Sequence, residues 1–102
     1  MSVRLRRIAK RDFRDAFNWY RGRNEAVSAR FANEVTRTLE HLERFPGTGG
    51  FVPGVRDPDI RRLPVHNFPY HVVFMRIGER ISVLAIAHDR RKPGYWMSDA
   101  KE

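Results

Sequence analysis

The sequence has no cysteine, so neither a disulfide framework nor a thiolate zinc site can form. It also has no long hydrophobic stretch: the longest uninterrupted apolar run is residues 83–87, far too short to span a membrane. The first seven residues include several arginines, but no apolar segment follows them, which argues against a secretory signal. We therefore expect a cytoplasmic protein that is not attached to a membrane.

Acidic residues are scarce. The 102 residues include 12 Asp and Glu against 20 Lys and Arg, which gives a formal net charge of +8. Such an excess favours an anionic partner, which is a nucleic acid, an acidic protein or an acidic membrane surface, and it does not choose among them. Hydrophobic residues make up 41% and aromatic residues 12%, values typical of a folded globular chain. We expect one domain covering residues 1–102.

The first half of the chain predicts a strand followed by two helices. Residues 3–7 alternate apolar and basic, the period of a strand with one solvated face. Residues 13–20 then place apolar side chains at helical spacing, and Gly22 is positioned to end that helix. Asn24 is a suitable N-cap for a second amphipathic helix, which Pro46 stops.

The second half predicts a loop and then three strands. Residues 48–58 are rich in Gly and Pro, and strands are expected at about 60–65, 70–77 and 80–87. Gly78–Glu79 suits a tight hairpin between the last two strands. These two strands are apolar on both faces, so we expect them at the centre of the sheet. The predicted fold class is α+β: a small antiparallel sheet with an N-terminal strand, an α-helical hairpin and three C-terminal strands.

The most informative segment for function is residues 88–96, directly after the most apolar strand. Three adjacent cations repel one another, and an anion bound there would explain them; Tyr95 and Trp96 offer faces for stacking. A solvated basic tail whose aromatic residues fold back onto the core explains the same residues equally well. Arg61 and Arg62 form a second basic pair, and alternation allows only one of them to face a shared site; protection of an edge strand by charge is the alternative. The candidate target-binding or nucleic-acid-binding residues are Arg61, Arg62, Arg91, Lys92 and Trp96.

The histidines do not predict a metal centre. None of His41, His66, His71 and His88 has a second ligand at metal-binding spacing, so we expect neither a metal nor a cofactor. His41 is expected at the surface and His71 as a hydrogen-bonded residue of the sheet. His88 is the best candidate for proton transfer because it ends a buried strand beside arginines. Phosphate-loop, nucleophile-elbow and HExxH motifs are missing.

Three segments together resemble the ParE/RelE superfamily of toxins from type II toxin–antitoxin systems. They are Arg61-Arg62-Leu63-Pro64-Val65, Phe68-Pro69-Tyr70-His71-Val72-Val73-Phe74, and the segment from Val83 through Ala87-His88-Asp89-Arg90-Arg91-Lys92-Pro93-Gly94-Tyr95-Trp96. The resemblance implies a small sheet carrying a helical hairpin, growth inhibition, and a cognate antitoxin whose extended tail wraps the toxin. One branch, ParE, contains gyrase poisons linked to plasmid stabilisation. The other, RelE, contains ribosome-dependent mRNA endonucleases.

The resemblance leaves three functions open. In the RelE branch His88, Arg90 and Tyr95 would be catalytic, as a metal-independent endoribonuclease requires. The lysines typical of the RelE middle strand are missing, since the chain's lysines are Lys10, Lys92 and Lys101, and this favours the ParE branch with DNA gyrase as target. The third possibility is an inactive relative that only binds the antitoxin and aids repression of their operon.

Overall fold

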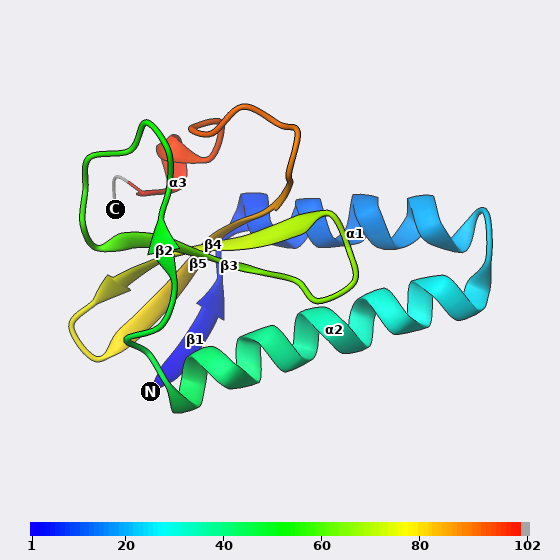
Figure 1. The fold of residues 1–102 in the computed structure, drawn as a ribbon, viewed down its shortest axis with the longest axis horizontal. Coiled ribbons are helices and arrows are strands. Elements are labelled where there is room, and N and C mark those ends of the chain that lie inside the picture. The colour runs from blue at the N-terminus through cyan, green and yellow to red at the C-terminus, as the bar shows by residue number, and fades with distance from the viewer. Residues whose placement is uncertain (101–102) are drawn as a thin grey trace.

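The computed structural model describes residues 1–100 as a five-stranded sheet with a helical hairpin against one face (Figure 1). The elements in chain order are β1 (Ser2–Leu5), α1 (Arg7–Arg21), α2 (Glu25–Arg44), β2 (Gly50–Phe51), β3 (Ile60–Pro64), β4 (Tyr70–Ile77), β5 (Arg80–His88) and α3 (Met97–Ala100). The strand order is β1-β5-β4-β3-β2. The predicted α+β class is confirmed, and no helix within residues 1–100 is both long and apolar enough to cross a membrane.

The helical hairpin begins and turns close to where the sequence predicts. Asn24 caps α2, because its side chain accepts hydrogen bonds from the backbone N–H groups of Ala26 and Val27 at 2.9 and 3.4 Å. The first helix is longer than its apolar stripe suggests and starts at Arg7. Its additional first turn is held because Ile8 is buried against the sheet.

The central strands form as predicted. β4 and β5 are joined by the two-residue turn Gly78–Glu79, in which Gly78 has a φ of +58° that a residue with a Cβ rarely adopts. The register shifts between Val73 and Phe74, so Leu84 has no residue directly opposite it. Leu84 and its neighbour therefore both contribute to the second core.

Two features of the sheet differ from the prediction of an antiparallel sheet with four strands. The N-terminal strand β1 runs parallel to β5, with residues 2–5 paired to residues 80–83. The predicted loop also contains the short strand β2, which pairs with Arg61 and Arg62 of β3. The partner of β1 lies almost eighty positions away, so its periodic pattern does not reveal the direction of pairing, and β2 is only two residues long, too short for a periodic pattern.

The sheet is buried on both faces, which explains why β4 and β5 lack a polar side. One core lies under the helical hairpin and includes Phe31, Val35, Leu42, Val72, Phe74, Ile81, Val83 and Ile86. The other lies under the β2–β3 loop and the C-terminal segment and includes Val52, Ile60, Val73, Met75, Leu84, Ala85 and Trp96. Trp96 is only 1% exposed. A ring with so little exposure has no open face on which a base could stack, and its position agrees with the alternative that the ring folds back onto the core.

Two carboxylates fasten the C-terminal segment to α1. Asp99 accepts a hydrogen bond from the backbone N–H of Ile8 at 3.0 Å, which satisfies a donor in the first turn of the helix. Asp12 accepts from the hydroxyl of Tyr95 at 2.7 Å and from the backbone N–H of Ile86 at 3.1 Å. β1 pairs with β5 only as far as Val83, so the backbone N–H of Ile86 has no partner strand on that edge and donates to Asp12 instead.

Candidate functional site

A pocket with a volume of about 240 Å³ lies beside the end of β5, on the face of the sheet that the C-terminal segment covers. Its floor is apolar and includes Val73 and Trp96. Its polar residues come from β3, β4, β5 and the segment after β5; they are Arg62, His71, His88, Asp89 and Arg91. We call this the β5 pocket.

The two histidines of the β5 pocket are held differently. The Nδ1 of His71 donates to the carboxylate of Asp89, so His71 is the hydrogen-bonded sheet histidine that its position predicts. The Nδ1 of His88 accepts from the backbone N–H of Arg90 at 3.1 Å, and its ring meets Tyr70 edge-to-face with centroids 5.1 Å apart. Each ring is thus fixed through its Nδ1, and for His88 the Nε2 is the remaining nitrogen for a ligand.

Arg61 and Arg62 point to opposite faces, as strand alternation requires. Arg62 lines the β5 pocket with His88 and Arg91. Arg61 instead donates to the backbone oxygens of Pro58 and Gly49 at 3.3 and 3.4 Å. Arg61 therefore supports the β2–β3 loop, and Arg62 is the member of the pair that the structure brings to the candidate site.

Tyr95 is tied to Asp12 and covered by Arg91. The Cζ of Arg91 lies 3.5 Å from the centroid of the Tyr95 ring. Burial, and then the hydrogen bond to Asp12, raise the pKa of Tyr95 above its ordinary value. Burial also raises the pKa of Asp12, against the opposing effect of its hydrogen bonds from Tyr95 and Ile86. A hydroxyl in this setting is poorly suited to accept or release a proton during a reaction.

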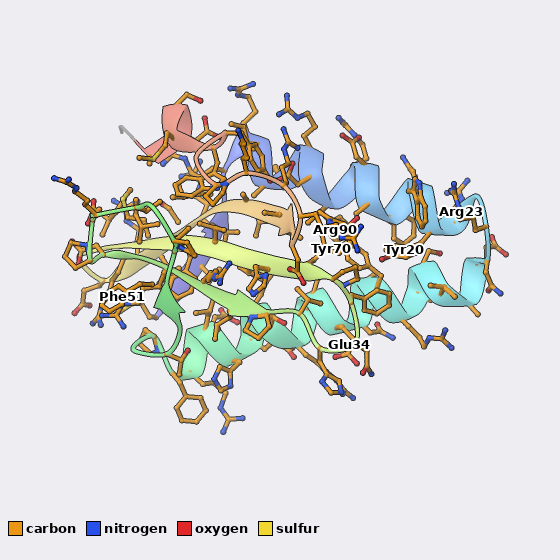
Figure 2. The ribbon with its side chains drawn as sticks, turned by 45° about the horizontal axis from the view of Figure 1, so that its top comes forward. Tyr20, Arg23, Glu34, Phe51, Tyr70 and Arg90 are labelled. Atoms are coloured by element: carbon orange, nitrogen blue, oxygen red, sulfur yellow. The ribbon has the colours of Figure 1, made fainter. Side chains whose placement is uncertain are left out.

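The remaining candidate residues lie at the surface. Arg90 and Lys92 are exposed, and Figure 2 shows Arg90 close to the end of β4 that carries Tyr70. His88 and Arg91 line a second hollow of about 250 Å³ on the other side of the segment, where Trp19 of α1 is 52% exposed. Residues 88–91 therefore separate two hollows and present charge to both.

The chemistry of the β5 pocket suits an anion. Two guanidinium groups and two imidazoles border an apolar floor, and arginine pairs with phosphate or carboxylate through two parallel hydrogen bonds. Among residues 1–100, no three His, Asp or Glu side chains gather closely enough to hold a metal ion. The sequence did not identify Asp89 as a member of the site. The available signal was that Asp89 directly follows β5, while the neighbouring strand β4 carries His71 near its start.

The chain matches a known protein family over residues 3–93, the ParE toxin of the type II toxin–antitoxin system parDE. Among solved structures it is similar to a chain of the chromosomal ParDE toxin–antitoxin system from P. aeruginosa, with a TM-score of 0.72 and 20% sequence identity. That similarity covers 86% of this chain and 95% of the other, and at such identity it shows the fold alone. Comparison with curated proteins found no significant match.

Proposed function

The chain belongs to the ParE toxin family of type II toxin–antitoxin systems, and from that membership we propose that it inhibits DNA gyrase and is neutralised by a cognate antitoxin. The observation that supports this proposal most strongly is the family match, which extends over nearly the whole chain. Gyrase and the antitoxin would both be met in the cytoplasm, where we propose that the protein acts.

The state of Tyr95 supports the gyrase function over RNA cleavage. A metal-independent ribonuclease needs groups that move protons between oxygens of the substrate. The Tyr95 hydroxyl already donates to Asp12, and its ring is covered by Arg91. Tyr95 is therefore a poor proton donor or acceptor, and β3 contributes the cation Arg62 and no lysine to the surface around the β5 pocket.

For the contact with gyrase we propose the cations around the end of β5, namely Arg62, Arg91 and Lys92. Arg62 and Arg91 face the same pocket, and Lys92 is exposed beside it. A carboxylate-bearing loop of gyrase fits this charge and the arginine fork. The proposed contact leaves out Arg61, which faces the other side and supports the β2–β3 loop.

The test is a cleavage assay with purified gyrase, ATP and supercoiled plasmid. Increasing amounts of the chain are expected to produce linear plasmid after protein removal, because a poison traps the enzyme on cut DNA. Reactions without gyrase, and reactions with toxin premixed with antitoxin, are the controls. Unchanged supercoiling and no cut DNA at a large molar excess of toxin would contradict the proposal.

Arg62→Ala and Arg61→Ala form a matched pair that locates the contact. Each removes one arginine from the same strand, but only Arg62 faces the β5 pocket. Arg62→Ala should weaken poisoning about tenfold or more, because a charge-assisted hydrogen bond contributes about 1.5–3 kcal/mol. Arg61→Ala should retain poisoning. Its thermal unfolding is measured as well, because this variant loses the hydrogen bonds to the backbone oxygens of Pro58 and Gly49. Equal activity of both variants would place the contact elsewhere.

For the antitoxin we propose the hollow between the helical hairpin and the turn after β3. The hollow has a volume of about 560 Å³ and is lined by residues of α1, α2 and the turn, among them Tyr20, Val27 and Phe68. Figure 2 shows Tyr20, which lines the hollow, next to Tyr70 of β4, and their ring centroids are 6.3 Å apart. An amphipathic tail could place an apolar side chain here. Val27→Asp should abolish rescue of growth by the antitoxin, and Thr36→Asp, at an exposed position of α2, should not.

RNA cleavage remains the second candidate because the β5 pocket gathers His71, His88, Arg62 and Arg91 in one place. Mapping of new RNA 5′ ends shortly after induction without antitoxin separates the two functions. Cuts clustered inside translated codons would establish cleavage and would contradict the gyrase proposal. Growth arrest without such cuts agrees with gyrase poisoning, and harmless expression would favour the inactive relative.

A further inference from the structure

Six cationic side chains line a further depression, at the turn from β1 into α1. The depression has a volume of about 590 Å³ and is lined by Arg4, Leu5, Arg6, Arg7, Lys10, Arg11 and Arg14. It shares no lining residue with the β5 pocket. We call it the N-terminal basic groove.

The groove results from two periodic patterns that meet at the turn from β1 into α1. On α1, residues 7, 10, 11 and 14 stand at the i, i+3, i+4 and i+7 positions of one helix face. This stripe is about 10 Å long, from a rise of about 1.5 Å per residue. The core-facing residues Ile8 and Asp12 lie on a different face, so the cations point outward. Arg4 of β1 extends the charge beyond the start of the helix.

Folding alone does not explain this arrangement. The N-terminus of a helix carries partial positive charge and prefers acidic side chains, yet the first turn of α1 has none. The pairs Arg7–Arg11 and Lys10–Arg14 also place like charges at i, i+4, which disfavours the helix. Within residues 1–100, the carboxylates near the stripe are Asp99, 3.7 Å from Arg7, Asp15, 3.9 Å from Arg14, and the buried Asp12 near Arg11. Four cations of the stripe thus meet three carboxylates within residues 1–100, one of them buried, and an external anion would offset the repulsion that remains.

We propose that the N-terminal basic groove binds the phosphate backbone of duplex DNA. A row of exposed Arg and Lys along one helix face suits contacts with successive phosphates that do not depend on base sequence. None of the seven lining residues is aromatic, whereas sites for single strands combine cations with rings on which bases stack. An acidic peptide fits the groove less well, because a docked peptide needs apolar pockets for its side chains and Leu5 is the one apolar residue among those that line the groove. This inference rests on the proposed function for the identity of the DNA, which we take to be the duplex bound by gyrase.

The experiment measures binding of a short fluorescent DNA duplex of mixed sequence to the full-length chain over a range of salt concentrations. One variant carries Arg4→Gln, Lys10→Gln and Arg14→Gln, all in the groove. The control variant carries Arg37→Gln, Arg56→Gln and Arg80→Gln, which removes the same charge at exposed positions outside the groove. Both variants are first checked for native thermal unfolding and for antitoxin binding by calorimetry.

The groove variant should bind DNA on the order of a hundredfold more weakly at 0.1 M salt, because each lost phosphate contact reduces the slope of log K against log salt by about 0.9. The control variant should keep a slope close to that of the unaltered chain. Equal losses in both variants would show only a dependence on net charge and would overturn the inference. Retained DNA binding with lost antitoxin binding would assign the groove to the antitoxin and would also overturn it.

The gyrase cleavage assay separates this inference from the proposed function. A chain that binds DNA through the groove but never produces cut plasmid would disprove gyrase poisoning and leave the groove assignment standing. Full poisoning by the groove variant at unchanged toxin concentration would show that gyrase inhibition does not use the groove for DNA. A tighter hold on a single strand than on the duplex would reject the duplex as ligand.

Discussion

The hydrogen bond between Tyr95 and Asp12 gives the sharpest test of the assignment of Tyr95 to structure rather than to catalysis. Tyr95→Phe removes the hydroxyl that donates to Asp12 over 2.7 Å and leaves the ring in place. Because the acceptor is a carboxylate and Tyr95 is only half-buried, the expected loss in the free energy of unfolding is about 1–2 kcal/mol. Toxicity should remain, since the hydroxyl has no role in the proposed contact with gyrase.

A double-mutant cycle isolates this bond from other effects. Asp12→Ala removes the acceptor and also leaves the backbone N–H of Ile86 without its partner, so its loss should be larger, about 2–4 kcal/mol. The cycle of Tyr95→Phe with Asp12→Ala should give a coupling energy of at least about 1 kcal/mol in urea denaturation. Sites that do not interact are additive within about 0.5 kcal/mol, so a coupling energy below that value would refute the reasoning. If Tyr95→Phe loses toxicity while its free energy of unfolding is unchanged, the hydroxyl has a catalytic role and the assignment of Tyr95 to structure is wrong.

Three further predictions concern local structure. Asn24→Ala should lower the free energy of unfolding by about 1 kcal/mol, because α2 loses the side-chain acceptor at its start, and denaturation by urea measures this. Gly49→Ala should lower the free energy of unfolding by about 1–3 kcal/mol, because Gly49 has a φ of +104° and a Cβ there would lie 2.9 Å from the ring of Phe74. Gly50→Ala is the control and should be nearly neutral, because a Cβ at Gly50 meets open space. Similar melting temperatures for the two variants would contradict this prediction. Burial raises the folded-state pKa of Asp12, so the part of the stability that depends on its bound proton is complete below the ordinary carboxyl pKa and is lost as pH rises through the folded value. The stability of the unaltered chain relative to Asp12→Asn should therefore be greater at acidic pH than at neutral pH, and the opposite trend in pH-dependent denaturation would show that the pKa is not raised.

The sequence predicted the parts of the fold that depend on local periodicity. The helical stripe ending before Pro46, the N-cap at Asn24 and the Gly78 turn each have a signal within a few residues, and each is confirmed. The parallel pairing of β1 with β5 has no such signal, because its partners are nearly eighty positions apart. Strand alternation also correctly indicated that only one of Arg61 and Arg62 would join a shared site, but only the structure shows that it is Arg62.

The sequence was less informative about which charged and aromatic residues meet a partner. Trp96 follows a basic run and resembles a stacking residue, yet burial in the second core accounts for it. The N-terminal basic groove was missed because Arg4 belongs to a strand pattern and Lys10 to a helix pattern, and their meeting depends on the turn between the two elements. A helix whose first turn has arginine and lysine but no acid was the available signal.

The pairing of β1 with β5 also determines when the protein can fold during synthesis. Residues 2–5 leave the ribosome early but wait for residues 80–83 before they gain a neighbouring strand. The second core waits even longer, since it needs Trp96. We therefore expect the nascent chain to stay incompletely folded until residues 80–96 have emerged. We also expect slow folding for a domain of this size, because so many contacts join distant positions. The surfaces that depend on these late segments, the β5 pocket among them, should therefore form only after Trp96 has left the ribosome.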